Sequence, residues 1–117
     1  MIGIDQFIAE MTCRFPGLQG EVDAHVENND GLLAHVLFWD ITSDVLVAFR
    51  GDDDGLSWRD ALAFFDESYL RGDREVREVL VTSFLLNLPW PDQPGYEIVG
   101  HLGPVLAERF VAVRPNG

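Results

Sequence analysis

The stretch LRGDREVREVLVTSFLLNL, residues 70–88, decides the fold, because it has the clearest helical pattern and the densest apolar content of the chain. Gly72 is a residue type that ends helices, and Asp73 is one that begins them, since its side chain can accept free amide hydrogens. One helix is therefore predicted to stop at Arg71 and another to start at Arg74. From there, residues recur at the spacing of one helical face: Val76, Val79, Leu80, Ser83, Phe84, Asn87 and Leu88.

The second half of this central helix is expected to be buried on most sides. Val81, Leu85 and Leu86 place further apolar groups off the main face. Apolar groups all round a helix indicate burial. Ser83 and Asn87 on the buried face then require hydrogen-bond partners.

Apolar residues recur at helical spacing along most of the remaining chain. The other predicted helices cover residues 3–14, a less regular segment after Pro16, residues 57–71 with Ser57 as the N-cap, and two short helices meeting at Gly103 and Pro104. Residues 89–95 are rich in proline and form a linker. Residues 111–117 are expected to fray, as chain ends often do.

Residues 32–49 are ambiguous, because their Val, Ile, Phe and Trp content suits strands while their spacing suits a helix. A β-hairpin at residues 35–49, turned at residues 42–44, is the alternative. No glycine stands at that turn and the neighbouring segments are helical, so a helix is favoured. The sequence thus predicts an all-α fold, a compact single domain over residues 1–117 with about five or six helices.

Charge is the strongest global property, since 20 Asp and Glu against 8 Arg leave a formal net charge of −12. This charge argues against direct binding of nucleic acid or of an anionic membrane surface, because both require a positive patch. The chain also lacks an apolar run long enough to span a membrane. No secretory signal is recognised and the single Cys13 cannot form an intramolecular disulfide, so the cytoplasm is the expected compartment. We expect Cys13 to be buried or half-buried.

The chain has no recognisable catalytic or metal-binding pattern. His25, His35 and His101 lie on separate predicted elements, without the i, i+4 spacing of a helical zinc site. The acidic loop GDDDG, residues 51–55, fails the spacing of a calcium loop, because Arg50 would occupy a ligand position. A serine nucleophile motif and a phosphate-binding glycine loop are also missing. We therefore predict a protein that is not an enzyme, with no catalytic residue, no metal and no cofactor.

The acidic residues are instead candidates for a partner-binding surface. They fall into three groups along the chain: Asp40 with Asp44, the run Asp52, Asp53 and Asp54, and Asp66 with Glu67. If these groups face one direction, their field attracts a basic partner. Trp39, Trp58 and Trp90 are candidate aromatic anchors, because tryptophan is enriched at interface hot spots. Burial in the core is nevertheless the favoured expectation for Trp39 and Trp58, whereas Trp90 lies between prolines in the linker.

Three segments carry a resemblance to a known group of proteins: HVLFWDIT at residues 35–42, LRGDREVREVLVTSFLLNL at residues 70–88, and HLGPVLAERF at residues 101–110. The chain resembles small, mainly helical bacterial proteins of unknown function, some of which are suspected immunity proteins of polymorphic toxin systems. The resemblance implies a protein without enzymatic activity that binds and blocks a toxin domain. It provides no catalytic residues to carry over.

Charge and resemblance together lead to one functional hypothesis and one alternative. The hypothesis is an immunity or inhibitor protein, a monomer that forms a heterodimeric complex with a cognate toxin domain. The toxin is expected to have a basic active-site face, as a nuclease or nucleic-acid deaminase has, which carboxylates block by imitating phosphates. No nucleic acid or membrane is an expected partner. The alternative is a general protein-interaction or regulatory module without a toxin partner.

Overall fold

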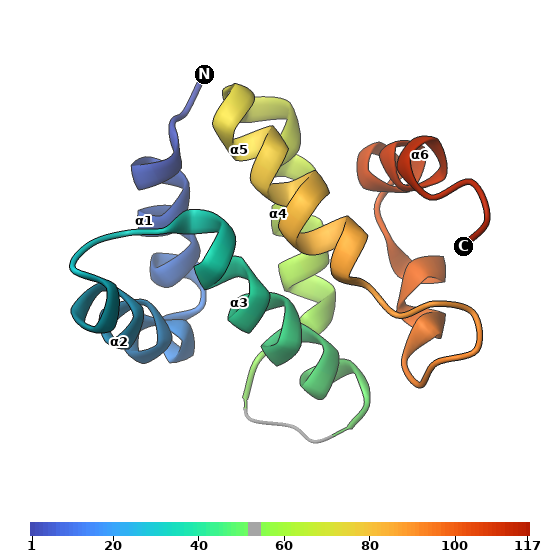
Figure 1. Ribbon diagram of the computed structural model, residues 1–117, viewed down its shortest axis with the longest axis horizontal. Helices are drawn as coiled ribbons and strands as arrows, with labels where there is room; N and C mark the ends of the chain where they lie inside the picture. Colours follow the sequence, from blue (N-terminus) through green and yellow to red (C-terminus); the bar gives the residue numbers. More distant parts are fainter. Residues whose placement is uncertain (52–54) are drawn as a thin grey trace.

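The computed structural model describes residues 1–51 and 55–117, and every regular element in those ranges is a helix (Figure 1). The α-helices are α1 (Ile4–Arg14), α2 (Gln19–Asn29), α3 (Ala34–Phe49), α4 (Trp58–Arg71), α5 (Arg74–Val79) and α6 (Pro104–Val113). Short helical turns of other types are η1 (Pro16–Leu18), η2 (Leu80–Phe84), η3 (Leu85–Asn87) and η4 (Tyr96–His101). The predicted all-α fold is confirmed.

The other helices pack against the continuous segment formed by α5, η2 and η3, which we call the central helix. One stripe of it stays exposed, so burial on most sides is not observed: Arg74, Glu75, Glu78, Thr82, Leu86 and Asn87. α3 and α4 contact this segment, with α1 and α2 on one side and α6 on the other (Figure 1). Within the described ranges, no helix is long and apolar enough to cross a membrane.

The helix boundary predicted at Gly72 and the cap predicted at Asp73 are confirmed, but Gly72 does not take the left-handed conformation in which a glycine usually ends a helix. The Asp73 carboxylate accepts a hydrogen bond from the Val76 amide at 3.0 Å and so caps α5. Gly72 has a φ of −78°, which is not left-handed. A Cβ at Gly72 would lie 2.5 Å from the Val76 side chain and 2.8 Å from the Ser68 carbonyl oxygen. Close packing at the turn therefore requires glycine there.

The central helix does not keep one winding along its length, which the sequence did not predict. η2 is a π-helix and η3 is a 3₁₀-helix. Where the winding changes and the helix nears its end, backbone carbonyls lose regular partners and can accept from other donors. The Ser83 carbonyl accepts hydrogen bonds from the Thr42 hydroxyl at 2.9 Å and from the Asn87 amide at 3.0 Å. The Ser83 hydroxyl has its own partner in His35 Nδ1 at 2.8 Å. Asn87 is exposed, so the expectation that it lies on the buried face is wrong.

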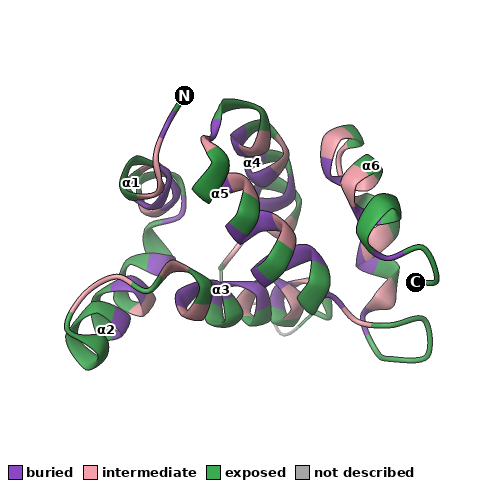
Figure 2. Cartoon of the chain, turned by 45° about the horizontal axis from the view of Figure 1, so that its top comes forward, coloured by how far each residue is buried: buried purple, intermediate pink, exposed green. Residues whose placement is uncertain are grey.

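The core is dominated by aromatic rings. They come from α1, α3, α4 and η2, and each is at most 2% exposed: Phe7, Phe38, Phe64, Phe65 and Phe84. Adjacent rings have centroids between 5.0 and 6.4 Å apart. Such tilted and offset pairs add stabilisation beyond the burial of their area. Figure 2 colours these buried positions along the helices.

Residues 34–49 form the single helix α3, so the hairpin alternative is wrong. The buried residues of α3 follow helical spacing: Leu37, Phe38, Ile41, Thr42, Val45 and Ala48. One helical face therefore collects the apolar groups that a hairpin would have divided between two strands. Burial of this face outweighs the strand preference of the individual Val, Ile and Phe residues.

The C-terminal segment is anchored, which corrects the expectation that residues 111–117 fray. Arg114 is only 3% exposed. Its guanidinium donates to three carbonyl groups at the end of the central helix, those of Leu85 at 3.2 Å, Leu88 at 2.7 Å and Pro89 at 2.8 Å. Because helix ends leave carbonyls without partners, Arg114 supplies a C-cap from a distant part of the chain. Burial lowers the pKa of this guanidinium.

Candidate functional site

The solvent face of α3 carries an exposed tryptophan beside a carboxylate. Trp39 is 58% exposed, the most exposed of the three tryptophans, so the expectation that it lies in the core is wrong. Asp40 follows it and is exposed, and Val47 two turns further on is 38% exposed. Since Phe38 points into the core, the rotation of about 100° per residue turns Trp39 outward. Large exposed aromatic groups are typical of binding surfaces.

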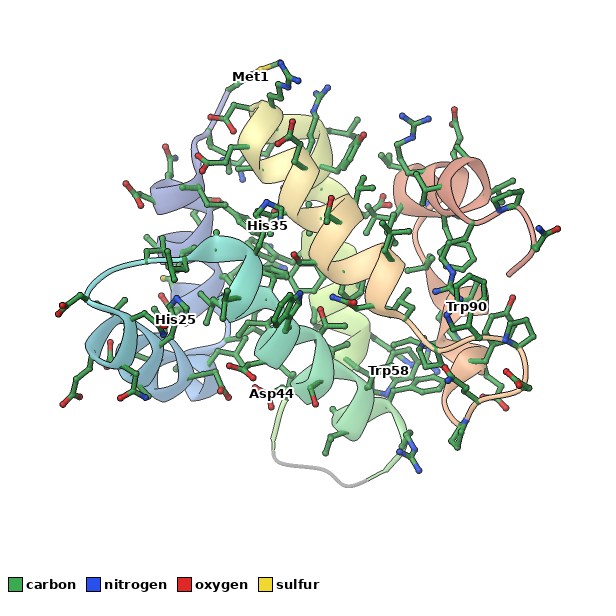
Figure 3. The ribbon with its side chains drawn as sticks, viewed as in Figure 1. Met1, His25, His35, Asp44, Trp58 and Trp90 are labelled. Atoms are coloured by element: carbon green, nitrogen blue, oxygen red, sulfur yellow. The ribbon has the colours of Figure 1, made fainter. Side chains whose placement is uncertain are left out.

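Of the other acidic candidates on or just after α3, the structure describes Asp44 but not the run that follows the helix. Asp44 is half-buried on α3 (Figure 3). Asp52, Asp53 and Asp54 lie outside the described residues. On α3, Asp40 is therefore the predicted acidic residue that is exposed.

The Asp66 carboxylate has a structural role between two helices. Its Oδ1 accepts a hydrogen bond from the Leu106 amide at 2.8 Å, which caps the start of α6 from α4. Gly103 lies against this carboxylate, and a Cβ there would come within 2.5 Å of the Asp66 side chain. Asp66 is half-buried in this contact with α6.

Glu67 faces α1 rather than α3. Its carboxylate lies 3.7 Å from the Arg14 guanidinium, and both side chains are about half exposed, at 57% and 49%. A pair of this kind contributes little stability. The structure therefore directs Asp66 to α6 and Glu67 to α1, and it does not gather them with Asp40 into one acidic patch.

Trp58 is half-buried in an aromatic cluster that joins three elements. Its ring meets Phe49 of α3 at a centroid distance of 4.8 Å and His101 of η4 at 5.0 Å, both edge to face. The Arg59 guanidinium carbon lies 4.3 Å from the centre of the same ring. These contacts give Trp58 a packing role, in agreement with the favoured expectation from the sequence, although the residue is only half-buried.

Trp90 is 45% exposed in the proline-rich linker. Its backbone amide donates to the Gln93 side chain at 2.9 Å, which fixes the turn. One face of its ring covers the Arg114 guanidinium, whose carbon lies 4.0 Å from the ring centre. Figure 3 places Trp58 and Trp90 away from the start of α3, near the C-terminal elements. Trp90 thus belongs to a different part of the surface from Trp39 and protects the buried arginine.

Two histidines hold backbone and hydroxyl groups in place. His25 is 5% exposed, and its Nε2 accepts the Leu33 amide at 2.9 Å, which fixes the turn before α3. His35 Nδ1 lies 2.8 Å from the Ser83 hydroxyl oxygen. A histidine beside a serine is the pairing that activates a nucleophile. Ser83 is 1% exposed, however, so a substrate has no access to its hydroxyl in this conformation.

In the described ranges, few of the acidic side chains form an ion pair with an arginine. In residues 1–51 and 55–117 the ion pairs are Arg14–Glu67, Arg71–Glu10 and Arg74–Glu78. Hydrogen bonds from Arg71 lower the pKa of Glu10. Across the same ranges, no three His, Cys, Asp or Glu side chains gather closely enough to hold a metal ion. Cys13 is exposed on α1, contrary to the expectation of burial.

Comparison with protein families gives a match over most of the chain. Residues 8–113 match the family described as "Domain of unknown function (DUF7674)". No curated protein and no solved structure matches the chain.

Proposed function

We propose that this chain, which belongs to the DUF7674 family of domains of unknown function, is an immunity protein that binds a cognate bacterial toxin domain and blocks its active site. The toxin domain has a basic active-site face, as in a nuclease or a nucleic-acid deaminase. The complex is a heterodimer formed in the cytoplasm, and the protein performs no catalysis in it. The resemblance of residues 35–42, 70–88 and 101–110 to suspected immunity proteins supports this function.

The observation that carries the proposal is the pairing of Trp39 and Asp40 on the solvent face of α3. Trp39 is 58% exposed, and burial of so large an apolar ring against a partner would be favourable. Asp40 is an exposed carboxylate next to it in the chain. The run Asp52, Asp53 and Asp54 follows the end of the same helix in the sequence.

This surface suits a mechanism of occlusion. The net charge of −12 attracts a basic face from a distance and raises the rate of association. Trp39 then fills an apolar pocket, where truncation of a hot-spot residue typically costs about 2 kcal/mol or more. Carboxylates such as Asp40 take the places of substrate phosphates. The toxin active site is thereby covered and no chemical step is needed.

The test is co-expression with the toxic product encoded beside the gene, measured as growth rescue and as binding of the purified pair. The double variant Trp39→Ala with Asp40→Asn should fold normally, because both side chains are exposed, and should lose rescue and binding. The matched control combines Val111→Ala with Asp92→Asn. It removes an apolar group that is 67% exposed and an exposed carboxylate elsewhere on the surface.

The outcomes separate the proposal from its alternatives. Loss of rescue and binding in the Trp39→Ala with Asp40→Asn variant, together with full rescue by the control variant, supports the proposal. If the native protein neither binds the neighbouring toxin nor rescues growth, the immunity function is wrong. If it binds and both variants bind equally well, the α3 surface is wrong.

A general interaction module is the second candidate, and salt distinguishes the two. Binding that depends on charge should weaken steeply between about 0.01 and 1 M salt, as the Debye length falls from about 30 to 3 Å. Binding through apolar contacts alone should change little over the same range.

A further inference from the structure

A trough with positive charge lies where α4, the central helix and α6 meet. Two hollows share Tyr69 and Arg77 and together form it. The first has a volume of about 470 Å³ and is mainly apolar, with Tyr69 and Val81 in its lining. The second has a volume of about 300 Å³ and lies beside Glu108 and Arg109 of α6. We call this feature the arginine trough.

Two arginines in the trough retain hydrogen-bonding capacity. Arg77 is held in place because its Nε donates to the Tyr69 carbonyl at 2.9 Å and its Nη2 to the Leu70 carbonyl at 3.4 Å, which leaves Nη1 open. Arg109 is half-buried, and the described residues offer its side chain no hydrogen bond or ion pair. Two arginines that line the same hollow can together receive a carboxylate.

The charged side chains that line the two hollows indicate which kind of anion the trough can bind. Arg74 lines the apolar hollow but is paired with Glu78 at 2.9 Å, so the two cancel. Arg77, Arg109 and Glu108 then leave one net positive charge around the second hollow. This suits a single carboxylate better than a phosphate group, which carries about −1.5 to −2 at neutral pH.

We propose that the arginine trough binds a short peptide segment of a partner in which an apolar side chain neighbours a carboxylate. The apolar side chain packs on Tyr69 and Val81, and the carboxylate lies between Arg77 and Arg109. The two hollows adjoin at Tyr69, so neighbouring groups of one peptide reach both. This site uses different elements from the α3 surface and takes a ligand of opposite charge from a basic toxin face. It is therefore independent of the immunity function.

The test is a titration of the ¹⁵N-labelled protein with acetyl-Leu-Glu-amide, followed through the Nε–H signals of the arginines. Saturable shifts at Arg77 and Arg109 in the millimolar range are expected. Acetyl-Leu-Gln-amide has the same shape without the charge and should bind about tenfold more weakly, as expected for the loss of a charge-assisted hydrogen bond. Equal binding of the two peptides, or no saturable shift with either, overturns the proposal.

Variants locate the site. Arg109→Gln should abolish the difference between the two peptides, whereas Arg59→Gln, which changes an exposed arginine stacked on Trp58, should leave it intact. Glu108→Gln removes a repelling carboxylate and should tighten binding of the charged peptide. Unchanged binding in both Arg109→Gln and Glu108→Gln overturns the proposal. If Arg109→Gln does not fold, Arg109→Lys and Glu108→Gln decide the matter, since both retain a positive trough.

Discussion

Arg114→Met should destabilise the protein by about 2 to 4 kcal/mol. The substitution keeps the length of the side chain and much of its contact with Trp90, but it removes the donors to Leu85, Leu88 and Pro89. The Leu85 carbonyl still accepts a bond from the Leu88 amide at 3.3 Å, so the main loss falls on the other two carbonyls. Each buried carbonyl without a partner costs about 1 to 3 kcal/mol, and relief of the buried charge offsets part of the sum.

Urea unfolding followed by circular dichroism measures this effect. With a slope of about 1 to 2 kcal/mol per molar urea, the midpoint should fall by roughly 1 to 4 M. Arg59→Met is the control, because it removes an arginine that also stacks on a tryptophan but is exposed, and it should cost less than about 1 kcal/mol. If the two variants have equal midpoints, Arg114 does not cap the central helix and the reasoning is refuted.

Three further substitutions test the packing of the helices, each through the free energy of unfolding. Leu80→Ala should cost about 2 to 5 kcal/mol, because Leu80 is completely buried; a loss below about 1 kcal/mol contradicts that burial. Gly72→Ala should cost about 1 to 3 kcal/mol, since its methyl group collides with Val76, and an unchanged midpoint contradicts the close approach. Asp66→Ala should cost about 0.5 to 2 kcal/mol by removing the cap of Leu106, whereas a neutral effect means that α6 needs no cap from α4.

The sequence was sufficient for the parts of the fold that depend on local signals. The cap at Asp73 and the stop before it are set by neighbouring residues, so the boundary between α4 and α5 could be predicted. α3 could be predicted because its buried residues repeat with the helical period over 16 residues. In both cases the deciding information lies within a few residues of the chain.

Features that depend on distant contacts could not be predicted. The π-helical turn at η2 is accompanied by a hydrogen bond from Thr42, 41 positions away from Ser83. Arg114 is anchored by carbonyls 25 to 29 positions away. Asp66 has the composition of a surface residue, and only the approach of α6 gives its carboxylate a capping role. The spacing of residue types along the chain does not show which distant groups come into contact.

The candidate site also combines features that the sequence could predict with features that depend on distant contacts. Charge alone indicated an acidic binding surface, but its predicted members Asp66 and Glu67 proved to engage α6 and α1. Core burial was favoured for Trp39 over a role as an exposed anchor, and the structure shows it exposed. A helical wheel centred on Leu37, Ile41 and Val45 places Trp39 on the outer side, so this signal was available in the sequence.

The central claim is that the solvent face of α3 binds the toxin domain, and the dissociation constant of the Trp39→Ala variant tests it most directly. A hot-spot tryptophan predicts a loss of about 30-fold or more in affinity for the toxic product encoded beside the gene, with unfolding unchanged. Val111→Ala should bind as the native protein does. Equal affinity of the Trp39→Ala and native proteins for that toxin contradicts the claim.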